Sequence, residues 1–79
     1  SALGKTVTRL GKLDQKPRTM VFSDTLWIAG TNQLFRLVNG NIIPAGQQRQ
    51  DIIIGFQPLI DKQLVVLATN NGLQTIPVP

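Results

Sequence analysis

The chain has 79 residues, a formal net charge of +4, and neither cysteine nor histidine. It therefore can form no disulfide, no Cys–His or Ser–His–Asp catalytic arrangement, and no zinc site of the usual kind. It also has no glutamate and no tyrosine, and its carboxylates are Asp14, Asp24, Asp51 and Asp61. We expect one small core and a protein that is not an enzyme, with no cofactor and no bound metal.

The positive charge is concentrated near the N-terminus, where residues 1–17 form a basic segment of strand and loop. The cations of this segment are Lys5, Arg9, Lys12 and Lys16, and Arg18 follows it directly. Such a segment can bind nucleic acid or an anionic membrane, but cations on an exposed edge also prevent sheets from aggregating. No aromatic residue lies among them to stack on bases. We expect a solvated segment, with no nucleic acid partner and no membrane insertion.

Composition predicts an all-β fold. Val, Ile and Thr supply 21 residues against four Ala, and β-branched side chains favour pleated sheets. Glycine and proline recur too often for an ordinary helix. In chain order, the sequence predicts antiparallel strands at residues 6–10, 18–22, 26–30, 34–38, 41–45, 52–54, 64–68 and 73–78.

Turn signals separate these strands. Asn39 and Gly40 predict a type I′ hairpin, which needs positive φ at both central residues. Pro44 then places residues 41–45 at a sheet edge. The apolar residues 52–54 and 64–68 predict strands that are buried on both faces.

Two segments of the chain repeat each other. Residues 26–37 and 65–76 align at an offset of 39 residues. An apolar stretch and a polar turn precede each segment, and the alignment of these preceding residues is shifted by two positions. The identical pairs are Ala29 and Ala68, Asn32 and Asn71, and Leu34 and Leu73. This period is typical of a four-stranded propeller blade. We therefore expect residues 1–79 to form a single β unit, with one blade at 18–46 and a second, partial blade at 52–79.

The repeated motif resembles a known family. Residues 26–40 read LWIAGTNQLFRLVNG, and residues 67–73 read LATNNGL. The first resembles the two-component regulator propeller repeat, and the second is similar to its central part. The resemblance implies a ligand-sensing β-propeller in the periplasm, part of a bacterial signalling protein, whose ligand is a small molecule such as a carbohydrate.

The motif residues have structural interpretations. Trp27 should wedge between adjacent blades. Gly30 and Gly72 suit tight turns or close backbone approach, and Asn32 and Asn71 suit positive φ or an Asx-turn. The motif residues interpreted in this way are Trp27, Gly30, Asn32, Leu34, Gly72 and Leu73.

Ligand contacts are expected where propeller loops meet at one end. These loops are 16–18 and 48–50, which enter the first strand of each blade, and 31–33 and 69–71, which join the second and third strands. The candidate ligand-binding residues are Lys16, Arg18, Gln48 and Arg49. The arginines are favoured because a guanidinium is a bidentate donor for carboxylate or phosphate.

Two blades cannot close a propeller, since the ring takes about four to eight. The chain is therefore expected to belong to a longer sensor, or to associate with copies of itself. The sequence is also compatible with a different fold, namely a small closed barrel or sandwich. The alternative function is then that of a basic β-barrel that binds nucleic acid, although Phe22, Trp27, Phe35 and Phe56 all lie in apolar strand contexts typical of a core.

Overall fold

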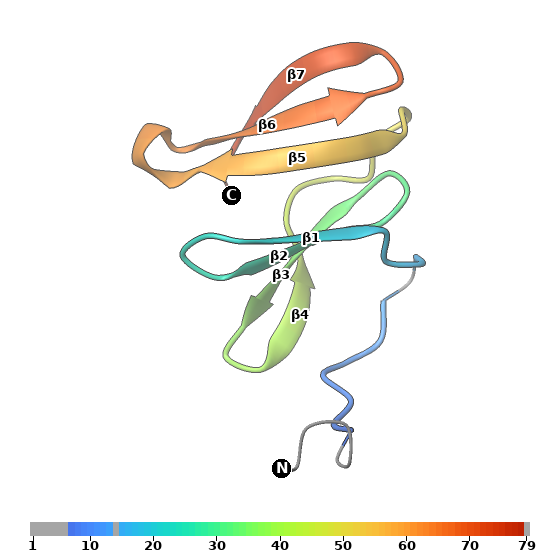
Figure 1. The fold of residues 1–79 in the computed structure, drawn as a ribbon, viewed down its shortest axis with the longest axis vertical. Helices are drawn as coiled ribbons and strands as arrows, with labels where there is room; N and C mark the ends of the chain where they lie inside the picture. The colour runs from blue at the N-terminus through green and yellow to red at the C-terminus, as the bar shows by residue number, and fades with distance from the viewer. Residues whose placement is uncertain (1–6, 14, 79) are drawn as a thin grey trace.

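The computed structural model describes residues 7–13 and 15–78 and shows two antiparallel β-sheets, one stacked on the other (Figure 1). The first sheet has the order β1 (Thr19–Phe22), β2 (Leu26–Ala29), β3 (Leu34–Val38), β4 (Asn41–Pro44). The second has the order β5 (Ile53–Leu59), β6 (Leu64–Thr69), β7 (Gly72–Pro77). The all-β prediction is confirmed, and the sheets are open: the described residues form neither a closed barrel nor a closed propeller.

Two strand predictions need correction. Residues 7–10 form no strand, and residue 6 lies outside the described residues. The strand predicted at 52–54 begins at Ile53 and continues to Leu59, because Pro58 still faces Val65 of β6. Proline has no N–H to donate, and it is tolerated there because β5 is the edge strand of its sheet. A short 3₁₀ helix, Ile60–Lys62, then leads into β6.

The Asn39–Gly40 turn has the geometry that the sequence predicts. The φ angles are 50° at Asn39 and 80° at Gly40. Positive φ at both positions is the signature of a type I′ turn, whose twist matches that of the flanking strands. It sets the register of β3 and β4, in which Val38 faces Asn41.

The sequence repeat is also a repeat of strand pairing. In the first sheet, Ile28 faces Phe35 and Ala29 faces Leu34. The residues 39 positions later pair identically, since Leu67 faces Gln74 and Ala68 faces Leu73. The two hairpins therefore share one register as well as one motif.

The first strand of each sheet repeats at a shorter offset. Met20 faces Ile28 in the first sheet, and Phe56 faces the equivalent Leu67 in the second. Met20 and Phe56 are 36 residues apart, so the sequence-based register shift of two residues is wrong. The turn between β5 and β6 contains the 3₁₀ helix, and the turn between β1 and β2 is shorter, which accounts for the difference.

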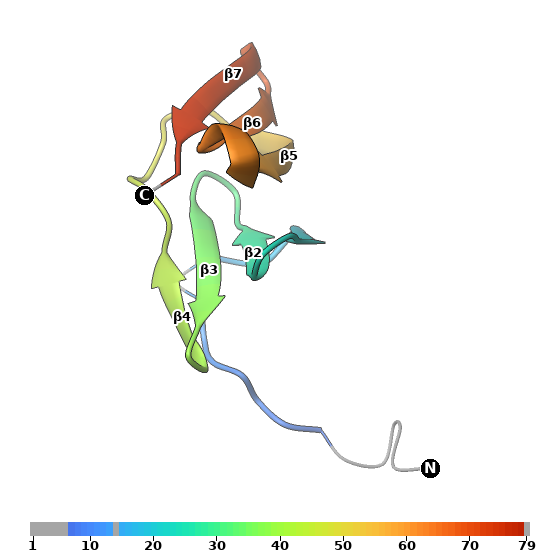
Figure 2. The same cartoon turned by 90° about the vertical axis from the view of Figure 1, so that its left-hand side faces the viewer.

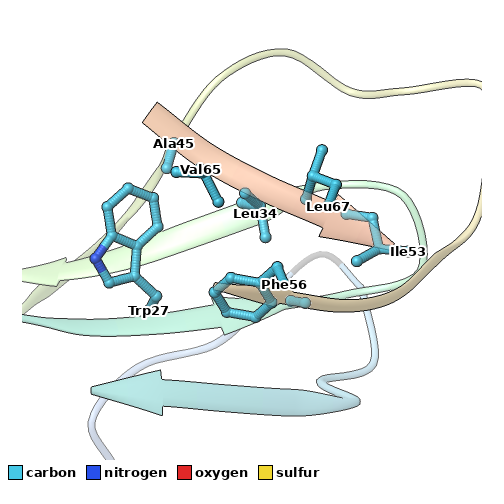
Figure 3. Close-up of a cluster of buried hydrophobic side chains, with 8 residues drawn as sticks. Trp27, Leu34, Ala45, Ile53, Phe56, Val65 and Leu67 are labelled. Atoms are coloured by element: carbon cyan, nitrogen blue, oxygen red, sulfur yellow. The ribbon is translucent and has the colours of Figure 1, made fainter. Parts of the chain in front are cut away.

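The sheets stack front to back. We define the front face of each sheet by Trp27, Ala29 and Leu34 in the first and by their counterparts Val66, Ala68 and Leu73 in the second. The back face carries Met20, Phe22, Ile28 and Phe35 in the first sheet, and Phe56, Pro58, Leu67 and Gln74 in the second. The core joins the front of the first sheet to the back of the second (Figure 3). Equivalent faces therefore point the same way, as in a repeating stack, and not toward each other across a two-fold axis.

Trp27 is the largest fully buried side chain of this contact. It is fully buried and lies in one cluster with Leu34, Phe56, Val65 and Leu67 (Figure 3). Its side chain thus fills the space between the two sheets.

The outer faces differ from the expectation of buried strands. Ile52 and Ile54 are exposed, and so is Phe22, at 73%. The sequence-based placement of these residues in a core is wrong, because no sheet covers their outer sides in the structure. Val66 and Ala68 are half-buried in the middle strand β6.

The later part of the N-terminal segment, residues 11–13 and 15–17, passes along the back of the first sheet, whereas the described chain before it leads away from the sheets (Figure 2). Gly11 lies so close to Ile42 that a Cβ there would be 2.9 Å from the Ile42 side chain. Ile28 and Phe35 are buried on this face, while Met20 remains 64% exposed. No helix in the described part of the chain is long and apolar enough to cross a membrane.

Candidate ligand-binding site

One edge of the stack gathers the loops of both sheets. The linker between β4 and β5 is held there by backbone hydrogen bonds. The Arg49 N–H donates to the Asn32 carbonyl at 2.7 Å, and the Ile53 N–H donates to the Thr31 carbonyl at 2.8 Å. On the other side, the Asn70 N–H donates to the Ile52 carbonyl at 3.1 Å. The linker therefore joins the β2–β3 turn to the β6–β7 turn.

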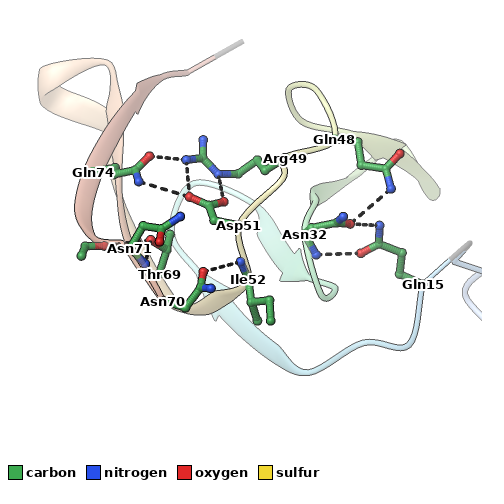
Figure 4. A network of polar contacts seen from close by, with 11 residues as sticks. Gln15, Asn32, Gln48, Arg49, Asp51, Ile52, Thr69, Asn70, Asn71 and Gln74 are labelled. Carbon is green, nitrogen blue, oxygen red and sulfur yellow. Dashed lines mark hydrogen bonds and ion pairs between the residues drawn. The ribbon is translucent and has the colours of Figure 1, made fainter.

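Asn32 connects three segments through its side chain and backbone (Figure 4). Its N–H donates to Gln15 Oε1 at 3.0 Å, and Gln15 Nε2 donates to Asn32 Oδ1. Gln48 Nε2 donates to the same oxygen at 3.4 Å. Gly30 permits this arrangement, because a Cβ there would be 2.4 Å from Gln15 Oε1.

The two glycines and two asparagines of the motif differ in backbone geometry. Gly72 has a φ of 102°, in the region that favours glycine, whereas Gly30 serves the close approach of Gln15. The described non-glycine residues with positive φ are Asn39 and Gln63, so neither Asn32 nor Asn71 has the positive φ that the sequence suggested as one option. Asn71 instead donates its N–H to the Thr69 hydroxyl at 3.0 Å, and that hydroxyl donates to the Gly72 carbonyl at 3.0 Å.

Arg49 and Asp51 form an ion pair within this edge (Figure 4). Arg49 Nε donates to Asp51 Oδ1 at 2.7 Å, and Arg49 Nη2 donates to Asp51 Oδ2 at 2.9 Å. Gln74 accepts a hydrogen bond from Arg49 Nη2 and donates Nε2 to Asp51 Oδ2 at 3.1 Å. The hydrogen bond from Arg49 lowers the pKa of Asp51 and, in return, raises the pKa of Arg49. The two charges compensate each other, so the edge is locally neutral.

A cavity of about 670 Å³ opens beside this ion pair. This volume is in the range of pockets that hold small molecules. Its apolar wall consists of Leu34, Ala45, Ile76 and Pro77, and its polar lining includes Gln47, Gln48, Arg49, Gln50, Asp51 and Asn71. The cavity thus offers an apolar surface beside side-chain amides, each with a donor and an acceptor.

The structure separates the four candidate ligand-binding residues. Gln48 and Arg49 line the cavity. Lys16 lines a second, more open cavity of about 680 Å³ between the N-terminal segment and the back of the first sheet, together with Arg9 and Lys12. Arg18 is exposed and lines neither cavity, although its N–H donates to the Ala29 carbonyl at 2.9 Å.

Sequence reasoning missed Asp51 and Gln74 as site residues. The Arg49-to-Asp51 spacing of two residues was a signal for the ion pair, since such neighbours in an extended linker can turn to the same side. Gln74 carried no such signal, because its place depends on the register of β7 against β6.

No group of three or more possible metal ligands occurs among the described residues. The cavity is lined by an apolar wall, side-chain amides and a charge-compensated ion pair. Comparison with known proteins found no family model, no curated protein and no solved structure that matches this chain.

Proposed function

We propose that the chain is a non-catalytic ligand-sensing module that binds a small neutral, hydroxyl-rich molecule, such as a carbohydrate, in the 670 Å³ cavity. The observation that carries the proposal is the lining of that cavity. It places four side-chain amides, Gln47, Gln48, Gln50 and Asn71, around an apolar wall. Sugar hydroxyls both donate and accept hydrogen bonds, and side-chain amides can do the same.

The ion pair argues for a neutral ligand. Arg49 already gives two of its N–H groups to Asp51, which is only 6% exposed. A ligand carboxylate or phosphate would have to displace Asp51 and leave its buried charge without this partner, which is costly. The expectation that Arg49 binds an anion directly is therefore replaced by a role in holding the linker and Gln74.

The front-to-back stacking and the shared hairpin register support a propeller type of architecture. In such an architecture, each sheet is one blade, and the loops at one end form the ligand site. The family resemblance adds that the module acts outside the cytoplasm, in the sensing part of a bacterial signalling protein. This role requires no catalytic chemistry, because a ligand that binds one of two conformations more tightly shifts the population toward it.

The proposal can be tested by ¹H–¹⁵N correlation spectra during titration with glucose, maltose and N-acetylglucosamine, and separately with glucuronate and inorganic phosphate. We expect the neutral sugars to shift the resonances of Gln48, Arg49 and Asn71. Gln48→Ala and Asn71→Ala should each weaken binding up to about tenfold, because each removes a side chain from the lining.

Gln57→Ala is the matched control, because Gln57 is an exposed glutamine of β5 outside the cavity lining. It should leave the affinity unchanged. Shifts produced by phosphate and not by the neutral sugars would overturn the neutral-ligand proposal, and so would sugar-induced shifts that avoid the cavity residues.

A further inference from the structure

Three large apolar side chains are exposed on the two outer faces of the stack, and Ile54 of β5 is exposed as well. Leu73 on the front of the second sheet is 79% exposed. At the other end, Met20 and Phe22 on the back of the first sheet are 64% and 73% exposed. Met20 and Phe22 share one face, and Leu73 lies on the other beside half-buried Ala68 and Val66. Exposed apolar residues grouped in this way mark an interaction surface more often than single scattered ones do.

The counterparts of these residues are buried inside the chain. Leu73 corresponds to Leu34, which is 2% exposed because the second sheet covers it. Met20 corresponds to Phe56, which is 9% exposed, and Phe22 corresponds to Pro58, which is buried. Each exposed residue therefore occupies a position that the front-to-back contact already buries once in this molecule.

We propose that the front face of the second sheet binds the back face of the first sheet of a second copy of this chain. The contact between the two sheets within one chain is the template for this interface. Within the chain, a front face is covered by a back face. Each copy exposes one front face, which carries Leu73, and one back face, which carries Met20 and Phe22. The exposed front face of one copy can therefore be covered by the exposed back face of another. The two outer faces of one chain are thus the two halves of one repeated contact.

This association is head-to-tail. A head-to-tail contact produces a closed ring when the rotation between copies closes, and an open filament when it does not. Propeller rings hold about four to eight sheets. Since each chain contributes two sheets, a ring of about two to four chains follows from that range.

The N-terminal segment leaves room for this contact. It covers Ile28 and Ile42 on the back of the first sheet and borders the same cavity as Met20, whereas Met20 stays 64% exposed and Phe22, at the far end of β1, 73% exposed. The proposed interface on this side is therefore centred on Met20 and Phe22.

The test is the solution mass by light scattering on a sizing column, at about 10 µM and about 300 µM, for the wild type and three variants. Leu73→Glu and Phe22→Glu place a charge in each half of the interface. Val7→Glu is the control, because Val7 is 92% exposed in the N-terminal segment and belongs to neither face. All three substitutions are at exposed positions, and circular dichroism verifies that each variant keeps its β structure.

At about 300 µM we expect the wild type and Val7→Glu to have a mass that is a multiple of the 8.7 kDa chain, with the single chain favoured on dilution. Leu73→Glu and Phe22→Glu should each reduce it to a single chain. A wild type that is monomeric at the higher concentration overturns the proposal, and so does an oligomer that neither variant changes.

A mixture of the two variants tests the head-to-tail arrangement. The Phe22→Glu chain keeps an intact front face, and the Leu73→Glu chain keeps an intact back face. Mixed in equal amounts, they should form a heterodimer with one intact interface, although neither forms a dimer alone. A symmetric dimer through one face predicts instead that only one of the two variants is monomeric. Neither variant changes a residue of the ligand cavity, so failure here leaves the proposed function untouched.

Discussion

The guanidinium of Arg36 lies over the indole ring of Trp27, with its carbon 5.2 Å from the ring centroid. The two residues face each other across β2 and β3. Trp27 Nε1 also donates to Asp24 Oδ1 at 3.5 Å. The fully buried indole is thus held by a cation on one side and by a carboxylate at its edge.

Replacing this cation should lower stability measurably. Arg36→Met keeps an unbranched side chain but removes the charge, and a cation–π contact contributes about 0.5–1 kcal/mol. We expect a loss of that size in the free energy of unfolding, measured by urea denaturation with the fluorescence of Trp27, the single tryptophan. Arg18→Met, at an exposed cation, should change it by less than about 0.5 kcal/mol. Equal losses in both variants would mean that the ring contact contributes nothing specific.

The repeat supplies a second prediction, because Leu34 and Leu73 differ in burial but not in strand position. Leu34→Ala should cost about 2–5 kcal/mol, since it opens a cavity between the sheets. Leu73→Ala should cost less than about 0.5 kcal/mol in dilute protein, where the chain is single. Thermal and urea unfolding at about 5 µM would measure both. A similar loss from the two substitutions would contradict the front-to-back stacking.

Much of this fold could be predicted from local sequence. β-branched residues locate the strands, and the Asn39–Gly40 pair sets a hairpin register. The offset of 39 residues relates two hairpins that pair identically. These features depend on short-range chemistry, which a single sequence contains.

The exposed faces could not be predicted in the same way. An apolar run such as residues 52–54 indicates a strand that can be covered on both faces, but not whether a neighbour is there. Ile52 directly before β5 and Ile54 within it are exposed, because β5 is an edge strand and no further sheet of the described structure covers their outer sides. The candidate site was predictable only in part, because some of its contacts depend on strands that are distant in the sequence. Gln48 and Arg49 lie in a recognisable loop, whereas Gln74 reaches Asp51 only through the pairing of β6 with β7.

The Arg49–Asp51 pair predicts a dependence of stability on pH. The hydrogen bond from Arg49 lowers the pKa of Asp51 below its ordinary value of 3.8. A carboxyl whose pKa is lower in the folded state stabilises that state above its unfolded pKa, and the stabilisation is lost as the pH falls through the folded pKa. The free-energy difference between wild type and Asp51→Asn should therefore be constant from about pH 7 to 5 and should shrink below about pH 4.

Urea denaturation between those pH values measures this difference. Asp61→Asn is the control, because Asp61 is exposed in the turn before β6. If the stability advantage of the wild type over Asp51→Asn does not change on acidification, the ion pair does not form in solution. The hydrogen bond to Asp51 also raises the pKa of Arg49. The stabilisation linked to that shift is lost only at strongly alkaline pH, so Arg49 stays charged and does not itself titrate in this range.

Nucleic acid binding is the function that the basic segment would otherwise suggest, and we expect it to be absent at physiological salt. Arg9, Lys12, Lys16 and Arg18 are exposed, but Phe22 is the one exposed aromatic among the described residues. Single strands are bound through several stacked bases, and four phosphate contacts alone give a salt slope of only about −3. Fluorescence anisotropy of a labelled oligothymidine at about 20 mM and 150 mM salt measures this. A Kd below about 1 µM at the higher salt, lost in Phe22→Ala but kept in Val7→Ala, would instead favour a nucleic acid surface on the back of the first sheet.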